Sequence, residues 1–506
     1  MSGLLLEQSV PGATTCLLIG DLPAAAGPDL GRYQAVLWWA DRDPGQTLPA
    51  GLSRDRVQIG RPGRVAPAEI TPVLERFIRL NPRVLPSFFI TAAIGGPNAG
   101  VYQEIITAAH AQLESSRRSR LTRQQDGFAW QKHILQNAAD YTRHRLPATW
   151  AGALRGLPAF VCGAGPSLDV SIAGLATHAD HAVIFAADSA LRALARHGVA
   201  ADFAVSTDAA KVPGKCLPAD CAPARVVLAS VSPPAWQDAL PADRRLFLSG
   251  HQLTDDWLAA QGIARTGVAA AESCGSTALE LAHHLGCDPI HLFGLDLAVD
   301  QANQARRHQQ DADPALYVKS NYDATVQLPR VPGNYAETVP CFALGDWREL
   351  DARLAARTGV RIFNVNDRGA RLRGTTLVHP DQFSPASTAG SKQARLAALP
   401  GSDPEPAAGA ALARIAAVGA RGQQALPGLR QALERGGPAA LATAFLPVVL
   451  DAETGRAFGA FALKLMPHLV PPIEGDGAFW QSLLNEFEEL ATLALRAGAA
   501  PGPGTR

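Results

Sequence analysis

The chain has 506 residues, with 46 basic and 46 acidic side chains and a formal net charge of zero at pH 7. At about 100–200 residues per domain, this length predicts two to four domains with ample core, which excludes a small disulfide-stapled scaffold. The balanced charge does not indicate a nucleic-acid partner, because the densest basic patch is the short run at residues 117–120.

The first 125 residues predict a smaller N-terminal α/β domain. Short apolar runs at residues 16–20 and 35–39 are typical of strands, and glycines and prolines separate them. Apolar residues then recur at helical spacing between 128 and 141, and Pro147 ends that pattern. We therefore expect a helical connector after the first domain.

A central domain at residues 126–385 is predicted to contain a Rossmann-like, doubly wound parallel sheet. Between about 157 and 299, apolar runs typical of strands alternate with helical runs. The expected strands are residues 159–162, 182–186, 203–206, 225–229, 246–248 and 289–293. The clearest expected helices are residues 190–197 and 276–285.

The last part of the chain predicts a helical C-terminal domain, residues 386–506. Its composition shifts to Ala, Leu, Gly and Pro, and amphipathic runs fall at residues 410–420, 426–434 and 479–495. Before this domain, the polar stretch at residues 301–313 is expected to be either a mobile lid or an exposed loop.

The cysteines and the N-terminus indicate a cytoplasmic location. Seven cysteines are an odd number, their spacing is irregular, and they form no Cys-x-x-Cys pair, so we expect free thiols and no metal site. The N-terminus lacks a basic region followed by a long apolar segment, and no window approaches the roughly 18 apolar residues of a membrane helix. We expect no stable membrane insertion.

A glycine-rich turn follows the first strand of the predicted central sheet and opens a helix. Gly163 and Gly165 permit close backbone approach, Pro166 suits the first helical position, and Ser167 adds a hydroxyl near unpaired N–H groups. This pattern predicts an anion-binding cup, most simply for a phosphate. Leu168 replaces the third glycine of Gly-x-Gly-x-x-Gly, which disfavours an NAD-type turn.

Polar residues follow other predicted strands. Asp188 and Ser189 end the second strand, where Rossmann domains place an acid that binds ribose. Further along lie Thr207, Asp208, Gly275, Ser276, Thr277 and Asp296. Because ligands bind at the carboxyl edge of an open parallel sheet, we expect these residues to converge on one crevice. Asp208, Ser276 and Thr277 could instead cap helices.

Four strings in this order resemble the motility accessory factor (Maf) family. They are Val161-Cys-Gly-Ala-Gly-Pro-Ser-Leu-Asp169, Ile184-Phe-Ala-Ala-Asp-Ser-Ala-Leu-Arg192, Ala201-Asp-Phe-Ala-Val-Ser-Thr-Asp208 and His291-Leu-Phe-Gly-Leu-Asp-Leu-Ala298. Maf proteins are bacterial flagellin glycosyltransferases that share a domain with 6-hydroxymethylpterin diphosphokinases of the MptE-like type. The stretch at residues 364–374 also resembles the family's closing Asn-rich turn, with Arg368 where a glycine is usual.

The resemblance implies a sialyltransferase-like, metal-independent enzyme that needs no cofactor. It would transfer a nonulosonic acid, of the pseudaminic or legionaminic type, from a CMP donor to Ser or Thr of flagellin. By that similarity the turn from Gly163 to Ser167 would line the donor phosphate and ribose. Asp188 and Ser189 would stand where such sialyltransferases place an Asn-Gln pair, and Thr207 or Asp208 would contact the donor sugar.

The general base and the class of reaction remain open in the sequence. His308 is the best candidate base, because a neutral imidazole suits proton abstraction near pH 7, although a solvated loop histidine is the commoner reading. One alternative is a pterin diphosphokinase, which would use ATP and Mg²⁺ held by Asp208 and Asp296. Another is a non-catalytic adaptor that binds flagellin.

Overall fold

The computed structural model describes residues 4–22, 28–42, 48–49, 51–81, 83–218, 221–271, 273–299, 328–385, 392–401 and 405–498. The chain divides into two compact units. One contains residues 1–127, 432–449 and 462–480, and the other contains residues 128–431, 450–461 and 481–506. The three domains expected from the sequence, with boundaries near 125 and 385, stay a prediction.

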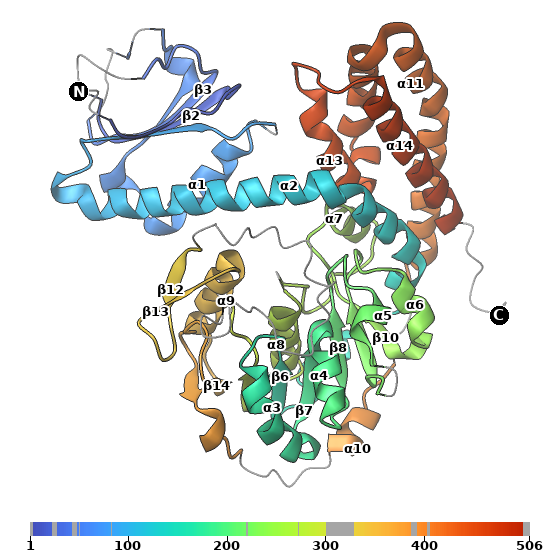
Figure 1. The fold of residues 1–506 in the computed structure, drawn as a ribbon. Helices are drawn as coiled ribbons and strands as arrows, with labels where there is room; N and C mark the ends of the chain where they lie inside the picture. The colour runs from blue at the N-terminus through green and yellow to red at the C-terminus, as the bar shows by residue number, and fades with distance from the viewer. Residues whose placement is uncertain are drawn as a thin grey trace. The chain divides into compact units, whose positions relative to one another are not determined.

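The first unit is built on a five-stranded sheet within its described residues, drawn in blue in Figure 1. The strand order is β1 (Leu4–Gln8), β5 (Ser87–Thr91), β2 (Thr15–Ile19), β3 (Ala35–Trp39), β4 (Val57–Gly60). Only the β1–β5 pair among them is antiparallel.

Apolar side chains fill both faces of this first sheet. Leu17 and Leu37 pack with α1 (Pro67–Ile78) and the start of α2 (Ala99–Arg143), whereas Leu18 and Val36 face a second cluster that includes Tyr33. Burial on both faces explains why these strands read as continuous apolar runs. The expected N-terminal α/β fold is confirmed.

The second unit contains an eight-stranded sheet within its described residues, and every neighbouring pair in it is parallel. From one edge to the other, the strands are β10 (Arg245–Phe247), β9 (Arg225–Leu228), β8 (Phe203–Ser206), β7 (Val183–Ala187), β6 (Ala159–Cys162), β11 (Ile290–Phe293), β14 (Ile362–Val365) and β15 (Thr376–Val378). The predicted doubly wound sheet is confirmed, and the six predicted strands lie within about one residue of the observed ones.

The chain order places a switch point in the middle of this sheet. From β6 the chain builds outward through β7, β8, β9 and β10, and it then returns to add β11 on the other side of β6. Loops that follow β6 and β11 therefore leave the same edge in opposite directions. Such a switch point is where open α/β sheets form a ligand crevice.

Helices cover the two faces of the central strands. Ala159 and Val161 belong to the core cluster that includes Ala278 and Leu279 of α8 (Cys274–His284). On the opposite face, the rings of Phe160, His291 and Phe383 pack edge to face. Burial lowers the pKa of His291 to about 4, as expected for a histidine in a core strand.

The remaining elements connect or flank these layers. They are α3 (Leu168–Thr177), α4 (Leu191–Arg196), α5 (Pro213–Cys216), α6 (Ala235–Ala239), α7 (Leu253–Ala260), β12 (Arg330–Pro332), β13 (Thr338–Pro340), α9 (Leu344–Ala356) and α10 (Lys392–Ala397). In the part of the chain that the structure describes, no helix is both long enough and apolar enough to cross a bilayer.

The C-terminal part is helical, as the sequence predicts. It contains α11 (Ala408–Leu450), α12 (Thr454–Ala457), α13 (Gly459–Leu469) and α14 (Gly477–Gly498), shown in orange to red in Figure 1. The two predicted runs at 410–420 and 426–434 lie in the first helical segment of α11, and Gly437, with a non-helical φ of 67°, separates it from a second segment. A Cβ at Gly419 would lie 2.7 Å from the Ala491 carbonyl oxygen, so this glycine lets α11 and α14 pack closely.

Candidate functional site

Two glycine turns meet at the switch point between β6 and β11. The Gly163 N–H donates to the Phe293 carbonyl, and the Gly165 N–H donates to the Gly294 carbonyl, both at 2.7 Å. A Cβ on Gly163 would lie 2.5 Å from the Gly294 oxygen, and one on Gly165 would lie 2.6 Å from Oδ2 of Asp296. The two glycines are thus required by the close approach of the loop that follows β11.

Asp296 holds the glycine-rich turn from this second loop. Its Oδ2 accepts the Ser167 backbone N–H at 2.7 Å, and its Oδ1 accepts both the Ser167 hydroxyl and Nδ2 of Asn366, the latter at 2.9 Å. All three side chains are essentially buried. Burial raises the pKa of Asp296 above its usual value, although the hydrogen bonds from Ser167 and Asn366 oppose that shift.

The sequence assigned these Ser167 donors to a bound phosphate. In the structure a carboxylate of the same chain takes them, so Ser167 is a buried residue that ties α3 to the switch point. Pro166 is also buried, whereas Ala164 at the tip of the turn is half-buried. A donor phosphate would therefore approach the turn at Ala164 rather than at Ser167.

The backbone around Asp296 adopts left-handed conformations on both sides. Gly294 has φ of 63°, and Leu297 has φ of 51°, which is unusual for a branched aliphatic residue. The Ala370 N–H donates to the Asp296 carbonyl at 2.8 Å, and a Cβ on Gly369 would lie 3.0 Å from the Asp296 Cα. The loop after β14 thus closes over Asp296 from the other side.

A second buried carboxylate, Asp188, follows β7. Its Oδ1 accepts the Ser189 N–H at 2.7 Å and its Oδ2 accepts the Ser206 hydroxyl at 2.8 Å. The Cys274 thiol also donates to Oδ2, with a sulfur–oxygen distance of 3.6 Å. Burial raises the pKa of Asp188, nearby Lys211 lowers it, and Asp208 raises it. Asp188 thereby links β7, β8 and the start of α8.

The accessible surface of this cluster comes mainly from the loop after β8. Thr207 is half-buried, and both its N–H (3.4 Å) and its hydroxyl (3.6 Å) lie beside the Cys274 sulfur. Asp208 is exposed and accepts the Ala210 N–H at 2.8 Å, which forms a local turn rather than a helix cap. Together with half-buried Ser189, these residues present polar groups to solvent.

The predicted residues at the start of α8 have mainly local partners. Ser273 caps the helix, because its hydroxyl oxygen accepts the Ser276 N–H at 3.2 Å. The Thr277 hydroxyl donates to the Ser273 carbonyl at 2.8 Å. A Cβ on Gly275 would lie 2.5 Å from Leu295, so this glycine lets α8 approach the loop after β11.

The structure thus brings the predicted residues to one edge of the sheet, in two layers. Buried members tie the loops together, namely Gly163, Gly165, Pro166, Ser167, Asp188, Gly275, Ser276, Thr277 and Asp296. Ser189, Thr207 and Asp208 form the accessible layer. The ligand-binding roles expected for both layers stay predictions. The candidate base His308 lies outside the described residues.

The sequence reasoning did not single out Asn366 or the hydrogen bonds of Cys274. Asn366 lies directly after β14, so the rule that placed Asp296 at the carboxyl edge could have found it. None of the seven cysteines, all of which lie in the described residues, forms a disulfide. Within the described ranges, no three His, Cys, Asp or Glu side chains gather in a way that could hold a metal ion.

Comparisons with known proteins agree with this geometry. Residues 132–302 match the family model described as 6-hydroxymethylpterin diphosphokinase MptE-like. These residues, about a third of the chain, are similar to an MptE-like domain. A search among curated proteins finds no match. The MptE-like domain includes β6 to β11 and every predicted site residue except His308, whereas Asn366 comes from the chain that follows.

The whole chain also has the fold of a solved structure, the MAf glycosyltransferase from Magnetospirillum magneticum AMB-1. The match has a TM-score of 0.56 at 17% sequence identity and covers 96% of this chain and 79% of that one. The expected likeness to an MptE-like domain is therefore confirmed for residues 132–302, and the expected Maf-type fold is confirmed for the chain.

Proposed function

We propose that the protein is a glycosyltransferase that moves a nonulosonic acid, of the pseudaminic or legionaminic type, from a CMP donor to Ser or Thr hydroxyls of flagellin. One observation carries the proposal. In a chain with the fold of the MAf glycosyltransferase, the loops after β6, β7, β8, β11 and β14 converge on one switch point. Such a point is where a doubly wound sheet binds nucleotides.

The proposed reaction asks three things of the site. The acceptor oxygen attacks the anomeric carbon, the bond from that carbon to the CMP phosphate oxygen breaks, and CMP leaves with the electron pair. The site must therefore stabilise charge on the leaving phosphate, remove the acceptor proton and exclude water. We assign removal of the acceptor proton to His308, and binding of the phosphate to the backbone of the turn at half-buried Ala164.

The two buried carboxylates suit a supporting role in this proposal. Asp188 and Asp296 each use both oxygens to accept hydrogen bonds from the protein, so they fix the loops rather than reach the donor. Contacts to the nucleotide and sugar would then come from Ser189, Thr207 and Asp208, whose side chains are accessible. A rigid buried layer below an accessible polar layer is an arrangement that holds a ligand in one orientation.

The description of the matched family favours a second candidate, a 6-hydroxymethylpterin diphosphokinase that uses ATP and Mg²⁺. That reaction would need carboxylate oxygens for the metal, and Asp208 and Asp296 are the candidates. Asp208 is exposed, but the Asp296 oxygens already accept three protein donors. This geometry supports the glycosyltransferase over the kinase.

A transfer assay separates these candidates. The full chain is incubated with flagellin and either CMP-pseudaminic or CMP-legionaminic acid, and glycosylated peptides are identified by mass spectrometry. A parallel reaction contains ATP, Mg²⁺ and 6-hydroxymethylpterin. Transfer of a nonulosonic acid to flagellin supports the proposal. Formation of the pterin diphosphate, or flagellin binding with no transfer of either donor sugar, contradicts it.

Two variants test the assigned roles. We expect Thr207→Val to weaken binding of the CMP-nonulosonic acid donor by about tenfold, the loss of one hydrogen bond of ~1.4 kcal/mol. The matched control is Thr177→Val, at an exposed helical threonine whose hydroxyl donates to Ala173. His308→Ala should abolish transfer while the dissociation constant of CMP stays unchanged. Unchanged transfer by His308→Ala would exclude it as the base.

A further inference from the structure

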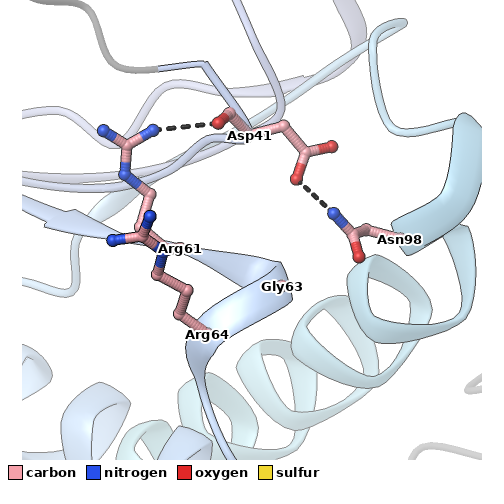
Figure 2. Close-up of a pocket in the computed structure, with 5 residues that line it drawn as sticks. All are labelled: Asp41, Arg61, Gly63, Arg64 and Asn98. Carbon is pink, nitrogen blue, oxygen red and sulfur yellow. Dashed lines mark hydrogen bonds between the residues drawn. The ribbon is translucent and has the colours of Figure 1, made fainter.

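The first unit contains a cavity that the proposed function does not use. It has a volume of about 430 Å³ and is lined by Asp41, Arg61, Gly63, Arg64 and Asn98, which Figure 2 shows together. This volume lies within the roughly 300–1,000 Å³ typical of sites for small ligands.

Strand register places the cavity at the carboxyl edge of the first sheet. Trp39 pairs with Gly60, and the Ala40 N–H donates to the Gly60 carbonyl at 3.1 Å. Asp41 and Arg61 therefore leave the ends of the neighbouring parallel strands β3 and β4 at the same level. This edge is where α/β sheets bind ligands, and it is distinct from the switch point of the MptE-like domain.

Two interactions fix the lining groups. Nη1 of Arg61 donates to the Asp41 carbonyl at 2.9 Å, and Nδ2 of Asn98 donates to Oδ1 of Asp41 at 2.7 Å. Figure 2 shows the Arg61 and Arg64 side chains on one side of the cavity, with Asp41 and Asn98 on the other. Among the lining residues that the structure describes, two guanidinium groups stand against one carboxylate, a formal excess of positive charge.

The charge of Asp41 also acts on a buried phenol. Tyr102 of α2 is fully buried, and its hydroxyl has no well-formed hydrogen bond within the described structure. Its burial, and next the charges of Asp41 and Asp21, raise its pKa. The Asp41 carboxylate therefore influences this buried phenol as well as lining the cavity, and Asn98 donates to one of its oxygens.

The chemistry of these groups restricts the ligand. Guanidinium groups only donate hydrogen bonds, so the part of the ligand that faces Arg61 and Arg64 must be an acceptor, best a phosphate. An ionised carboxylate only accepts, so the part that faces Asp41 must carry donors, such as adjacent sugar hydroxyls. We propose that this cavity binds a phosphorylated sugar, with its phosphate on Arg61 and Arg64 and its hydroxyls on Asp41. The proposal is independent of the glycosyltransferase function.

Calorimetric titration of the full chain tests this site. The probes are ribose 5-phosphate, inorganic phosphate, ribose and CMP. We expect ribose 5-phosphate to bind at least tenfold more tightly than phosphate or ribose alone. If CMP binds more tightly than ribose 5-phosphate and protects residues 60–65 from hydrogen exchange, the ligand is a nucleotide. If CMP binds more weakly than ribose 5-phosphate, the ligand is a free sugar phosphate.

Three variants locate the binding. Arg64→Gln should weaken ribose 5-phosphate binding at least tenfold, because it removes one charged partner of the phosphate. Its control, Arg56→Gln, removes an exposed arginine from the opposite end of β4 and should have no effect. Asp41→Asn should weaken ribose 5-phosphate but not inorganic phosphate. Within the described residues the exposed Arg64 side chain makes no hydrogen bond to the fold, so Arg64→Gln should have the melting temperature of the wild type.

Two results would overturn the proposal. One is equal binding of ribose 5-phosphate by the wild type and Arg64→Gln, when both melt at the same temperature. The other is protection from hydrogen exchange at residues 163–168 but not at 60–65 when ribose 5-phosphate binds, which would assign that ligand to the central site.

Discussion

Substitution of Gly165 by alanine tests whether the two loops at the switch point approach as closely as described. The new Cβ would lie 2.6 Å from Oδ2 of Asp296 and 2.7 Å from the Gly294 carbonyl oxygen. Real Cβ atoms do not approach oxygen so closely, and one of these contacts is backbone. The loop after β6 and the loop after β11 would therefore have to separate.

The loss of stability follows from the contacts that break when these two loops separate. Overpacking of a filled site costs about 1–3 kcal/mol. Weakening of the 2.7 Å hydrogen bond from the Gly165 N–H to Gly294 adds about 1 kcal/mol. Alanine offsets ~0.5–1 kcal/mol of this loss of stability, because it lowers the conformational entropy of the unfolded chain. We expect the free energy of unfolding to fall by about 1–3.5 kcal/mol.

Calorimetry of the full chain measures this effect. For a unit of about 340 residues, a loss of about 1–3.5 kcal/mol lowers the melting temperature by roughly 1–5 °C. Gly428→Ala is the matched control, since Gly428 is exposed in α11 with no atom within 4 Å of a new Cβ, and it should stabilise by up to ~1 kcal/mol. If Gly165→Ala melted at or above the wild-type temperature while the control behaved as expected, the close approach would be refuted.

Three further predictions concern the same unit. Burial raises the pKa of Asp296 above its usual 3.8, so the folded chain holds a proton that the unfolded chain releases. The free energy of unfolding should therefore fall as pH rises from about 4. Asp296→Asn should reduce this dependence of stability on pH, measured by urea denaturation. Lys392→Met should lower the free energy of unfolding by about 3 kcal/mol, because it leaves the mostly buried Asp202 without its 2.9 Å ion pair. Adding Asp202→Asn to that variant should restore part of the lost stability. Ser273→Ala should cost about 1 kcal/mol by uncapping α8, and an unchanged urea midpoint would contradict that role.

The central sheet could be predicted from the sequence because its strands are buried on both faces. Strand β6, residues Ala159–Cys162, is fully buried and reads as an unbroken apolar run between a proline and a glycine. Such runs have sharp ends, so their bounds could be placed closely. The long α2 and α11 were predicted only in part, because α2 is polar on average and its apolar stripe is weak before residue 128.

The partners within the site could not be predicted, because sequence motifs do not report contacts across the chain. Ser167 and Asp296 are 129 residues apart, and Asn366 lies another 70 residues further on. The motif placed Ser167 near unpaired N–H groups, but only the fold reveals that a carboxylate reaches them. In the same way, nothing in its surroundings marks Cys274 as a donor to Asp188, 86 residues earlier.

The glycine-rich turn therefore has two separable requirements. Gly163 and Gly165 are needed for contact with the loop after β11 whether or not a nucleotide binds, so the motif would persist in a chain that had lost its ligand. Accessible residues carry no such packing demand. Thr207 contacts solvent and the Cys274 sulfur, and its replacement should alter ligand binding with little change in stability. The binding defect of Thr207→Val, rather than the presence of the glycines, is thus the sharper criterion for an active site.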